Sequence, residues 1–179
     1  GNNGLADYWI IKLDDSGNKV WDKTYGGSDS DELYSLQQTL DGGYIVAGYT
    51  FSNDGDVSDG NNGDNDFWVL KLNSSGNREW DKTYGGSMWE QVASIQQTAD
   101  EGYIVLGITE SNDGDISDGN NGHYDYWIIK LDGSGNKEWD KTYGGSNGEL
   151  TRSIQQTSDG GYIVAGNTWG DDGDITDGN

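Results

Sequence analysis

The chain repeats its own sequence with a period of 59 residues. Trp9, Trp68 and Trp127 are spaced by this period, and 34 of the 59 positions are identical in all three copies. We divide the chain into residues 1–59, 60–118 and 119–177, with 178–179 as the start of a further copy. A period of this length indicates one supersecondary unit that stacks on its neighbours. Because the chain begins and ends in the same phase, we expect it to be either an excerpt of a longer array or an engineered unit of one.

Each copy contains the signals of four short strands and none of a helix. In the first full set we predict strands at 34–39, 43–50, 66–72 and 78–84. Glycine-containing turns at 41–43 and 73–77 join the first pair and the last pair. The runs at 43–48 and 67–72 are almost continuously apolar, which is typical of central strands covered on both faces. The run at 79–84 is charged and alternating, which is typical of an edge strand.

This order of strands predicts an all-β fold of β-propeller-type four-stranded blades, because four antiparallel strands form one propeller blade. Complete blades are expected at about 33–84 and 92–143, with a half-blade at each end of the chain. Three blades are too few to close, so we expect an incomplete ring in one chain. One small sandwich per repeat is the alternative, although 59 residues with four strands cannot easily cover two sheets.

Several motifs carry a resemblance to a known family. They are Lys71-Leu72, Gly76, Trp80, Tyr84-Gly85-Gly86-Ser87 and the run at 102–109. In this order they are similar to the bacterial seven-bladed β-propeller repeat family of secreted tandem-repeat proteins. The resemblance implies the fold and an extracellular or cell-surface setting in bacteria, more than an activity. The Asp-rich loop of this chain is longer than the family pattern.

The amino-acid composition limits the classes of partner that this chain is able to bind. Asp and Glu number 32 against 10 Lys and Arg, which gives a net charge of -22. This charge would be repelled by a phosphate backbone or an anionic membrane surface, so we expect no nucleic-acid partner. No apolar stretch reaches the length of a membrane span. The chain has no cysteine, which excludes thiolate metal sites and cysteine nucleophiles. Aromatic residues make up 12% of the chain and provide the material for a core.

The connection between the two central strands is rich in Asp, Asn and Gly and is the main candidate for a metal site. Carboxylates at alternate positions followed by Asp-Gly-Asn are similar to the spacing of calcium loops, and calcium takes six to eight oxygen ligands. We predict Ca²⁺ ligands among Asp54, Asp56, Ser58 and Asp59, among Asp113, Asp115, Ser117 and Asp118, and among Asp172, Asp174, Thr176 and Asp177. Plain Asx turns without a metal are the alternative.

No set of residues predicts catalysis. His123 is the only histidine and stands where the other copies have Leu5 and Asp64, so the repeat cannot build a triad or a zinc site from it. Acidic pairs are able to perform glycosidase chemistry, but near-identical repeats argue against it, because an active site is normally a single asymmetric place. We therefore predict that the chain is not an enzyme.

Two hypotheses of function stay open, and a third is disfavoured. The first is a non-enzymatic extracellular repeat module, structural or adhesive, which assembles between chains or within a longer array by self-association of its half-blade ends. The second is a glycan-binding propeller lectin that uses the aromatic side chains Trp89 and Trp169 beside the loops. The third, a hydrolase, is disfavoured because near-identical repeats argue against a single active site. The links at 29–34, 88–93 and 147–152 differ among the copies, which favours either ligand-recognising tips or unconstrained loops.

Overall fold

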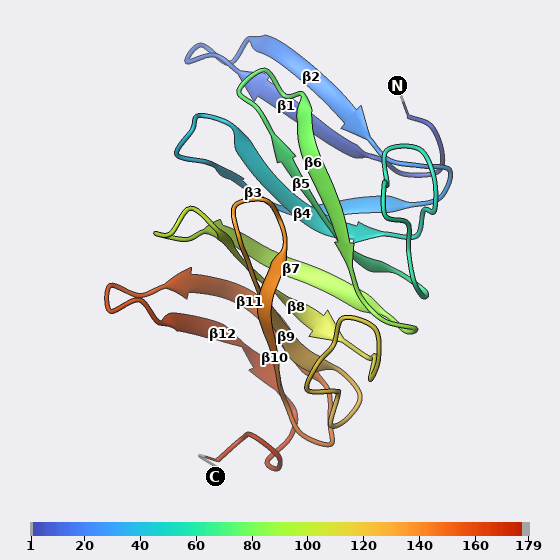
Figure 1. Ribbon diagram of the computed structural model, residues 1–179, viewed down its shortest axis with the longest axis vertical. Helices are drawn as coiled ribbons and strands as arrows, with labels where there is room; N and C mark the ends of the chain where they lie inside the picture. The colour runs from blue at the N-terminus through green and yellow to red at the C-terminus, as the bar shows by residue number, and fades with distance from the viewer. Residues whose placement is uncertain (1, 177–179) are drawn as a thin grey trace.

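The computed structural model describes residues 2–176 and is all-β (Figure 1). No helix occurs in this part of the chain, and so none that could span a membrane. The twelve strands are β1 (Tyr8–Leu13), β2 (Lys19–Tyr25), β3 (Asp31–Gln38), β4 (Tyr44–Thr50), β5 (Asp66–Leu72), β6 (Arg78–Tyr84), β7 (Glu90–Gln97), β8 (Tyr103–Thr109), β9 (Asp125–Leu131), β10 (Lys137–Tyr143), β11 (Glu149–Gln156) and β12 (Tyr162–Thr168).

The strands form four antiparallel sheets in chain order. Strands β3–β6 make one four-stranded sheet and β7–β10 another, whereas β1–β2 and β11–β12 are two-stranded. Over residues 2–176 the sheets follow one another without closing into a ring (Figure 1). The central strands β4 and β5 are buried at every position, as their continuous apolar runs predict.

The predicted strand boundaries hold at β5 and β6 and are wrong at β3. We expected that strand to begin at residue 34, but it begins at Asp31. The ladder between β3 and β4 is irregular between Leu33 and Ser35, so Tyr34 has no partner residue in it. A bulge of this kind breaks the alternation of inward and outward side chains, which is why the polar start of the strand resembles a link. Strand β4 begins one residue later than predicted, at Tyr44.

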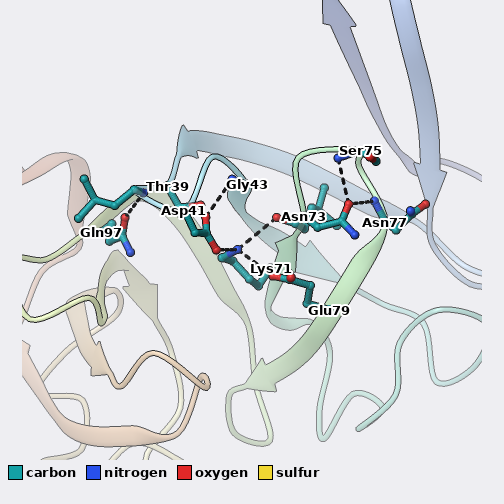
Figure 2. A network of polar contacts seen from close by, with 11 residues as sticks. Thr39, Asp41, Gly43, Lys71, Asn73, Ser75, Asn77, Glu79 and Gln97 are labelled. Carbon is teal, nitrogen blue, oxygen red and sulfur yellow. Dashed lines mark hydrogen bonds and ion pairs between the residues drawn. The ribbon is translucent and has the colours of Figure 1, made fainter.

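The hairpin turns form where the sequence predicts them. Gly42 and Gly76 have φ values of 81° and 75°, the left-handed conformation that glycine adopts most easily. The Asn73 side chain closes the second turn by accepting hydrogen bonds from the backbone N–H groups of Ser75 and Asn77, each at 3.0 Å (Figure 2).

A buried lysine forms ion pairs at the same end of the sheet (Figure 2). The Lys71 side chain is 5% exposed, and its Nζ lies 2.7 Å from Asp41 Oδ2 and 2.8 Å from Glu79 Oε2. Burial acts to lower the pKa of Lys71, but the two carboxylates outweigh it and raise the pKa above its ordinary value. Lys71 therefore links the β3–β4 turn to β6 as a charged group.

Neighbouring sheets pack through aromatic side chains. The rings of Tyr8 and Trp68 lie 4.7 Å apart between the first two sheets, and those of Phe67 and Trp127 lie 4.8 Å apart between the next two. Trp68 and Trp127 are fully buried in the cores between the sheets. The first strands of successive sheets are joined by side chains: Gln37 Oε1 accepts from the Gln97 N–H at 2.6 Å.

Candidate functional site

The Asp-rich loop between β4 and β5 is held against the turn that follows β2. Asp54 Oδ1 accepts a hydrogen bond from the Ser28 N–H at 2.7 Å. Asp56 donates its backbone N–H to Gly26 O at 3.0 Å, and its Oδ2 accepts from the Gly26 N–H at 3.3 Å. Val57 is buried in the core beside these contacts. The first two predicted ligands thus lie at one Gly-Gly turn.

The next two predicted ligands lie against β6 instead. Ser58 donates its Oγ–H to Asp81 Oδ1 at 2.7 Å and its N–H to Asp81 Oδ2 at 2.8 Å. Asp59 pairs with Lys82 at 3.2 Å. The loop oxygens are therefore divided between two neighbouring elements, and each set has protein partners.

The other two loops have the same arrangement as far as the structure describes them. Asp113 Oδ1 accepts from the Ser87 N–H at 2.8 Å, and Asp172 Oδ1 from the Ser146 N–H at 2.8 Å. The remaining contacts join Asp115 to Gly85, Ser117 to Asp140, Asp118 to Lys141 and Asp174 to Gly144. Thr176 is exposed, and Asp177 lies outside the described residues. Within 2–176, no group of three or more His, Asp or Glu side chains is arranged to hold a metal ion.

Sequence reasoning missed a buried pair of carboxyl groups beside the second and the third Gly-Gly turn. Asp66, at the start of β5, and Glu90, at the start of β7, are both fully buried. A Cβ on Gly85 would collide with Asp66 Oδ1 and lie 2.8 Å from Glu90 Oε2, so the two oxygens face the same small volume. Glu90 is satisfied by the Gly86 N–H at 2.9 Å and the Thr109 hydroxyl at 2.7 Å.

Asp66 is not satisfied in the same way. Its Oδ2 accepts from the Asn62 N–H at 2.9 Å, but its buried Oδ1 has no hydrogen-bond partner. Burial raises the pKa of Asp66 to about 7, and the negative charges of Glu90 and Asp115 add to the effect. Asp125 repeats the arrangement, with an unpartnered Oδ1 and a raised pKa caused first by burial. Asp66 is therefore an acid that keeps its proton up to about pH 7.

The two tryptophans proposed for ligand binding lie in different surroundings. Trp89 is partly buried and packs edge-on against Tyr124, with ring centroids 5.6 Å apart. Trp169 follows β12 and is 64% exposed. His123 is exposed, and its Nδ1 lies 3.1 Å from Glu110 Oε1.

The last four-stranded sheet has an open apolar surface toward β12. A groove of about 570 Å³ lies between β9, β10 and β12. It is lined by Tyr126, Ile128, Trp139, Lys141, Tyr143, Tyr162 and Val164. Tyr143 is 46% exposed there, whereas Tyr84, which stands 59 residues earlier, is buried.

Neither a protein-family model nor a curated protein matches this sequence.

Proposed function

We propose that this chain is a non-enzymatic extracellular repeat module, structural or adhesive, that assembles between chains by completing propeller-type blades. The two-stranded sheets are half-blades in this proposal, and β11–β12 of one copy pairs with β1–β2 of another. The support is a set of contacts that recurs where neighbouring sheets meet, while its two halves are left open at opposite ends of the chain.

The recurring contacts consist of an aromatic pair and a hydroxyl bond. Between the first two sheets, Tyr8 packs on Trp68, and the Tyr25 hydroxyl donates to the Gly76 carbonyl. Between the next two, Phe67 packs on Trp127 and the Tyr84 hydroxyl donates to the Gly135 carbonyl. In each case the tryptophan and the glycine belong to the third strand of the following sheet and the turn after it.

After the last four-stranded sheet, neither contact of this set is made among the described residues, although a further aromatic contact recurs there. Trp139 packs edge-on against Tyr162 of β12, at 5.8 Å, as Trp80 packs against Tyr103. Tyr126 and Tyr143, however, line the open groove, where their counterparts in the earlier sheets meet a tryptophan and a glycine carbonyl. The groove therefore corresponds to the surface that, between the earlier sheets, is covered by the third strand of the following sheet and the turn after it.

The missing half is exposed at the other end of the chain. Trp9 corresponds to the fully buried Trp68 and Trp127, yet it is 63% exposed. Gly17 corresponds to Gly76 and has nothing near its Cβ position, whereas Gly76 lies against the Trp21 ring. A second copy placing Trp9 on Tyr126 and the Gly17 carbonyl at the Tyr143 hydroxyl would complete the set.

The pairing register follows from the two four-stranded sheets. Tyr44 lies opposite Leu72 and Thr50 opposite Asp66, and β8 and β9 pair in the same way. The equivalent pairing places Tyr162 opposite Leu13 of the second copy, and Thr168 opposite its Asp7. Two chains joined in this way give six blades, which is within the usual range for a closed propeller; a rotation that fails to close gives a filament.

Sedimentation velocity of the 179-residue chain tests the proposal, and we expect dimers or larger species at micromolar concentration. Trp9→Ala should weaken association by at least about 2 kcal/mol, about thirtyfold in Kd, because the ring would be a central anchor of the interface. The matched control is Leu40→Ala, since Leu40 is also exposed but lies in the β3–β4 turn. A folded monomer, or equal association of both variants, would contradict the proposal.

Calcium is the cofactor that we propose for the Asp-rich loops. Several carboxylates within a few residues repel one another, and a bound cation would relieve this repulsion. The extracellular setting rests on the family resemblance. Neither calcium binding nor the extracellular setting is needed for the pairing of the sheet ends, so each of the two proposals is tested separately.

A further inference from the structure

Residues that differ among the 59-residue copies come together at one place on the loop side of the sheets. Trp89 precedes β7, Glu110 follows β8, and His123 and Tyr124 precede β9. We call these four residues the aromatic cluster. In Figure 1 they belong to the gold loop between β8 and β9 and to the link that leads into β7.

The rings of the aromatic cluster are packed against one another with one side open. His123 stacks on Tyr124 with ring centroids 4.0 Å apart and planes at 21°. Trp89 meets Tyr124 edge-on, at 66°. The His123 side chain is 63% exposed. The cluster therefore presents a fixed aromatic surface whose outer ring is accessible to solvent.

Polar groups surround this surface. The Glu110 carboxylate lies 3.1 Å from His123 Nδ1, and the Glu110 N–H donates to the Trp89 carbonyl at 3.0 Å. Burial raises the pKa of Tyr124, with a further contribution from Glu110 beside it. A shallow depression of about 500 Å³ adjoins the cluster, and Asn121 and Ser146 lie on its wall.

The same place carries different chemistry elsewhere in the chain. The positions 59 residues before the aromatic cluster are Ser30, Phe51, Asp64 and Asn65. They have one aromatic ring instead of three, and no basic group. Of these two equivalent places, only the one at Trp89 holds a set of side chains suited to a ligand.

We infer that the aromatic cluster binds a neutral sugar chain. The apolar face of a pyranose ring packs on an aromatic ring, while carboxylate and amide groups hydrogen-bond the hydroxyls around its edge. Glu110 and Asn121 provide these polar groups beside the ring of His123. The net charge of -22 disfavours an anionic ligand. The inference is independent of chain assembly, because Trp9 and the open groove take no part in it.

Titration calorimetry with the neutral hexasaccharides of cellulose, laminarin and mannan tests the inference. We expect one of them to bind with a stoichiometry of one per chain, and sialyllactose, which is anionic, to bind at least tenfold more weakly. The same binding should persist in the Trp9→Ala chain, so a failure of assembly and a failure of sugar binding are read separately.

The chain supplies its own control substitutions. Trp89→Ser, His123→Asp and Tyr124→Asn introduce the residues found at positions 30, 64 and 65, so the fold tolerates them in the same setting. We expect each to weaken sugar binding at least tenfold. The reverse exchange, with Ser30→Trp, Phe51→Glu, Asp64→His and Asn65→Tyr made together, should raise the stoichiometry from one to two.

Three results would overturn the inference. They are no binding of any of the three hexasaccharides at millimolar concentration, binding that the Trp89→Ser and His123→Asp chains retain in full, and tighter binding of tetramethylammonium than of every sugar. The last result would assign the cluster to cationic ligands.

Discussion

Replacing Asp66 with Asn is expected to change how the stability of the fold depends on pH. Asp66 is fully buried, its Oδ1 has no partner, and its pKa is raised from the ordinary 3.8 to about 7. In the folded chain this group keeps its proton up to about pH 7, while the unfolded chain releases it near pH 4. The folded state therefore binds more protons over this interval, and stability falls as pH rises.

The size of the effect follows from the two pKa values. A pKa raised from 3.8 to about 7 corresponds to about 4 kcal/mol between low and high pH. Linkage places about 3 kcal/mol of this between pH 5 and pH 8.5, with the full contribution present below the unfolded pKa and lost as pH passes through the folded pKa. Asn cannot ionise, so Asp66→Asn should lose about 3 kcal/mol less stability over the same interval.

Urea denaturation at several pH values measures this difference, with chelator present and at one protein concentration. Asp64→Asn is the matched control, because it replaces the same side chain by the same amide at an exposed position two residues away. The control should follow the wild type at every pH. If the free energies of unfolding of the wild type and Asp66→Asn run parallel from pH 5 to pH 8.5, Asp66 does not hold a proton in the folded chain and the reasoning fails.

Three further results are expected. Gly85→Ala should lower the free energy of unfolding, measured by urea denaturation, by more than about 2 kcal/mol, because the added Cβ would collide with a buried carboxyl oxygen. Gly17→Ala should lower it by about 1 kcal/mol, because the space there is open and only the positive φ is unfavourable. Lys71→Met should lower the free energy of unfolding by about 1 kcal/mol, since the two released carboxylates remain solvated, and an unchanged value would show that the ion pairs add nothing. Calcium at a hundredfold excess over its Kd should add about 2.7 kcal/mol to the free energy of unfolding, which is seen as a higher Tm than in chelator. The double variant Asp113→Asn and Asp115→Asn should lose part of that gain. Equal Tm values with calcium and with chelator would argue for plain turns.

The sequence predicts best where one residue type has one structural use. The strand predicted at 66–72 around the apolar run has the predicted bounds, because a buried central strand needs apolar side chains on both faces. Gly76 marks its turn for a similar reason, since the turn requires a positive φ. The start of β3 was missed because the bulge at Tyr34 hides the alternation on which strand prediction depends.

The candidate sites were harder to predict because they are made by packing between sheets. Asp66 and Glu90 are 24 residues apart and come together only when β5 and β7 are in place, so no local motif marks them. A signal was present in the identical Asp at positions 7, 66 and 125, directly before an aromatic strand residue. For the aromatic cluster the useful signal was the opposite one, a set of positions where the copies disagree.

The unlike surfaces at the two ends of the chain give any assembly a direction. One end presents Trp9 and the other presents the groove with Tyr126 and Tyr143. In the proposed assembly, addition of a copy at either end would cover one surface and display an identical new one, so growth by this contact would continue until the first and last copies meet. A Trp9→Ala chain keeps its groove but loses the ring that would enter the next one. Added in small amounts to the wild type, it would act as a terminator at one end only.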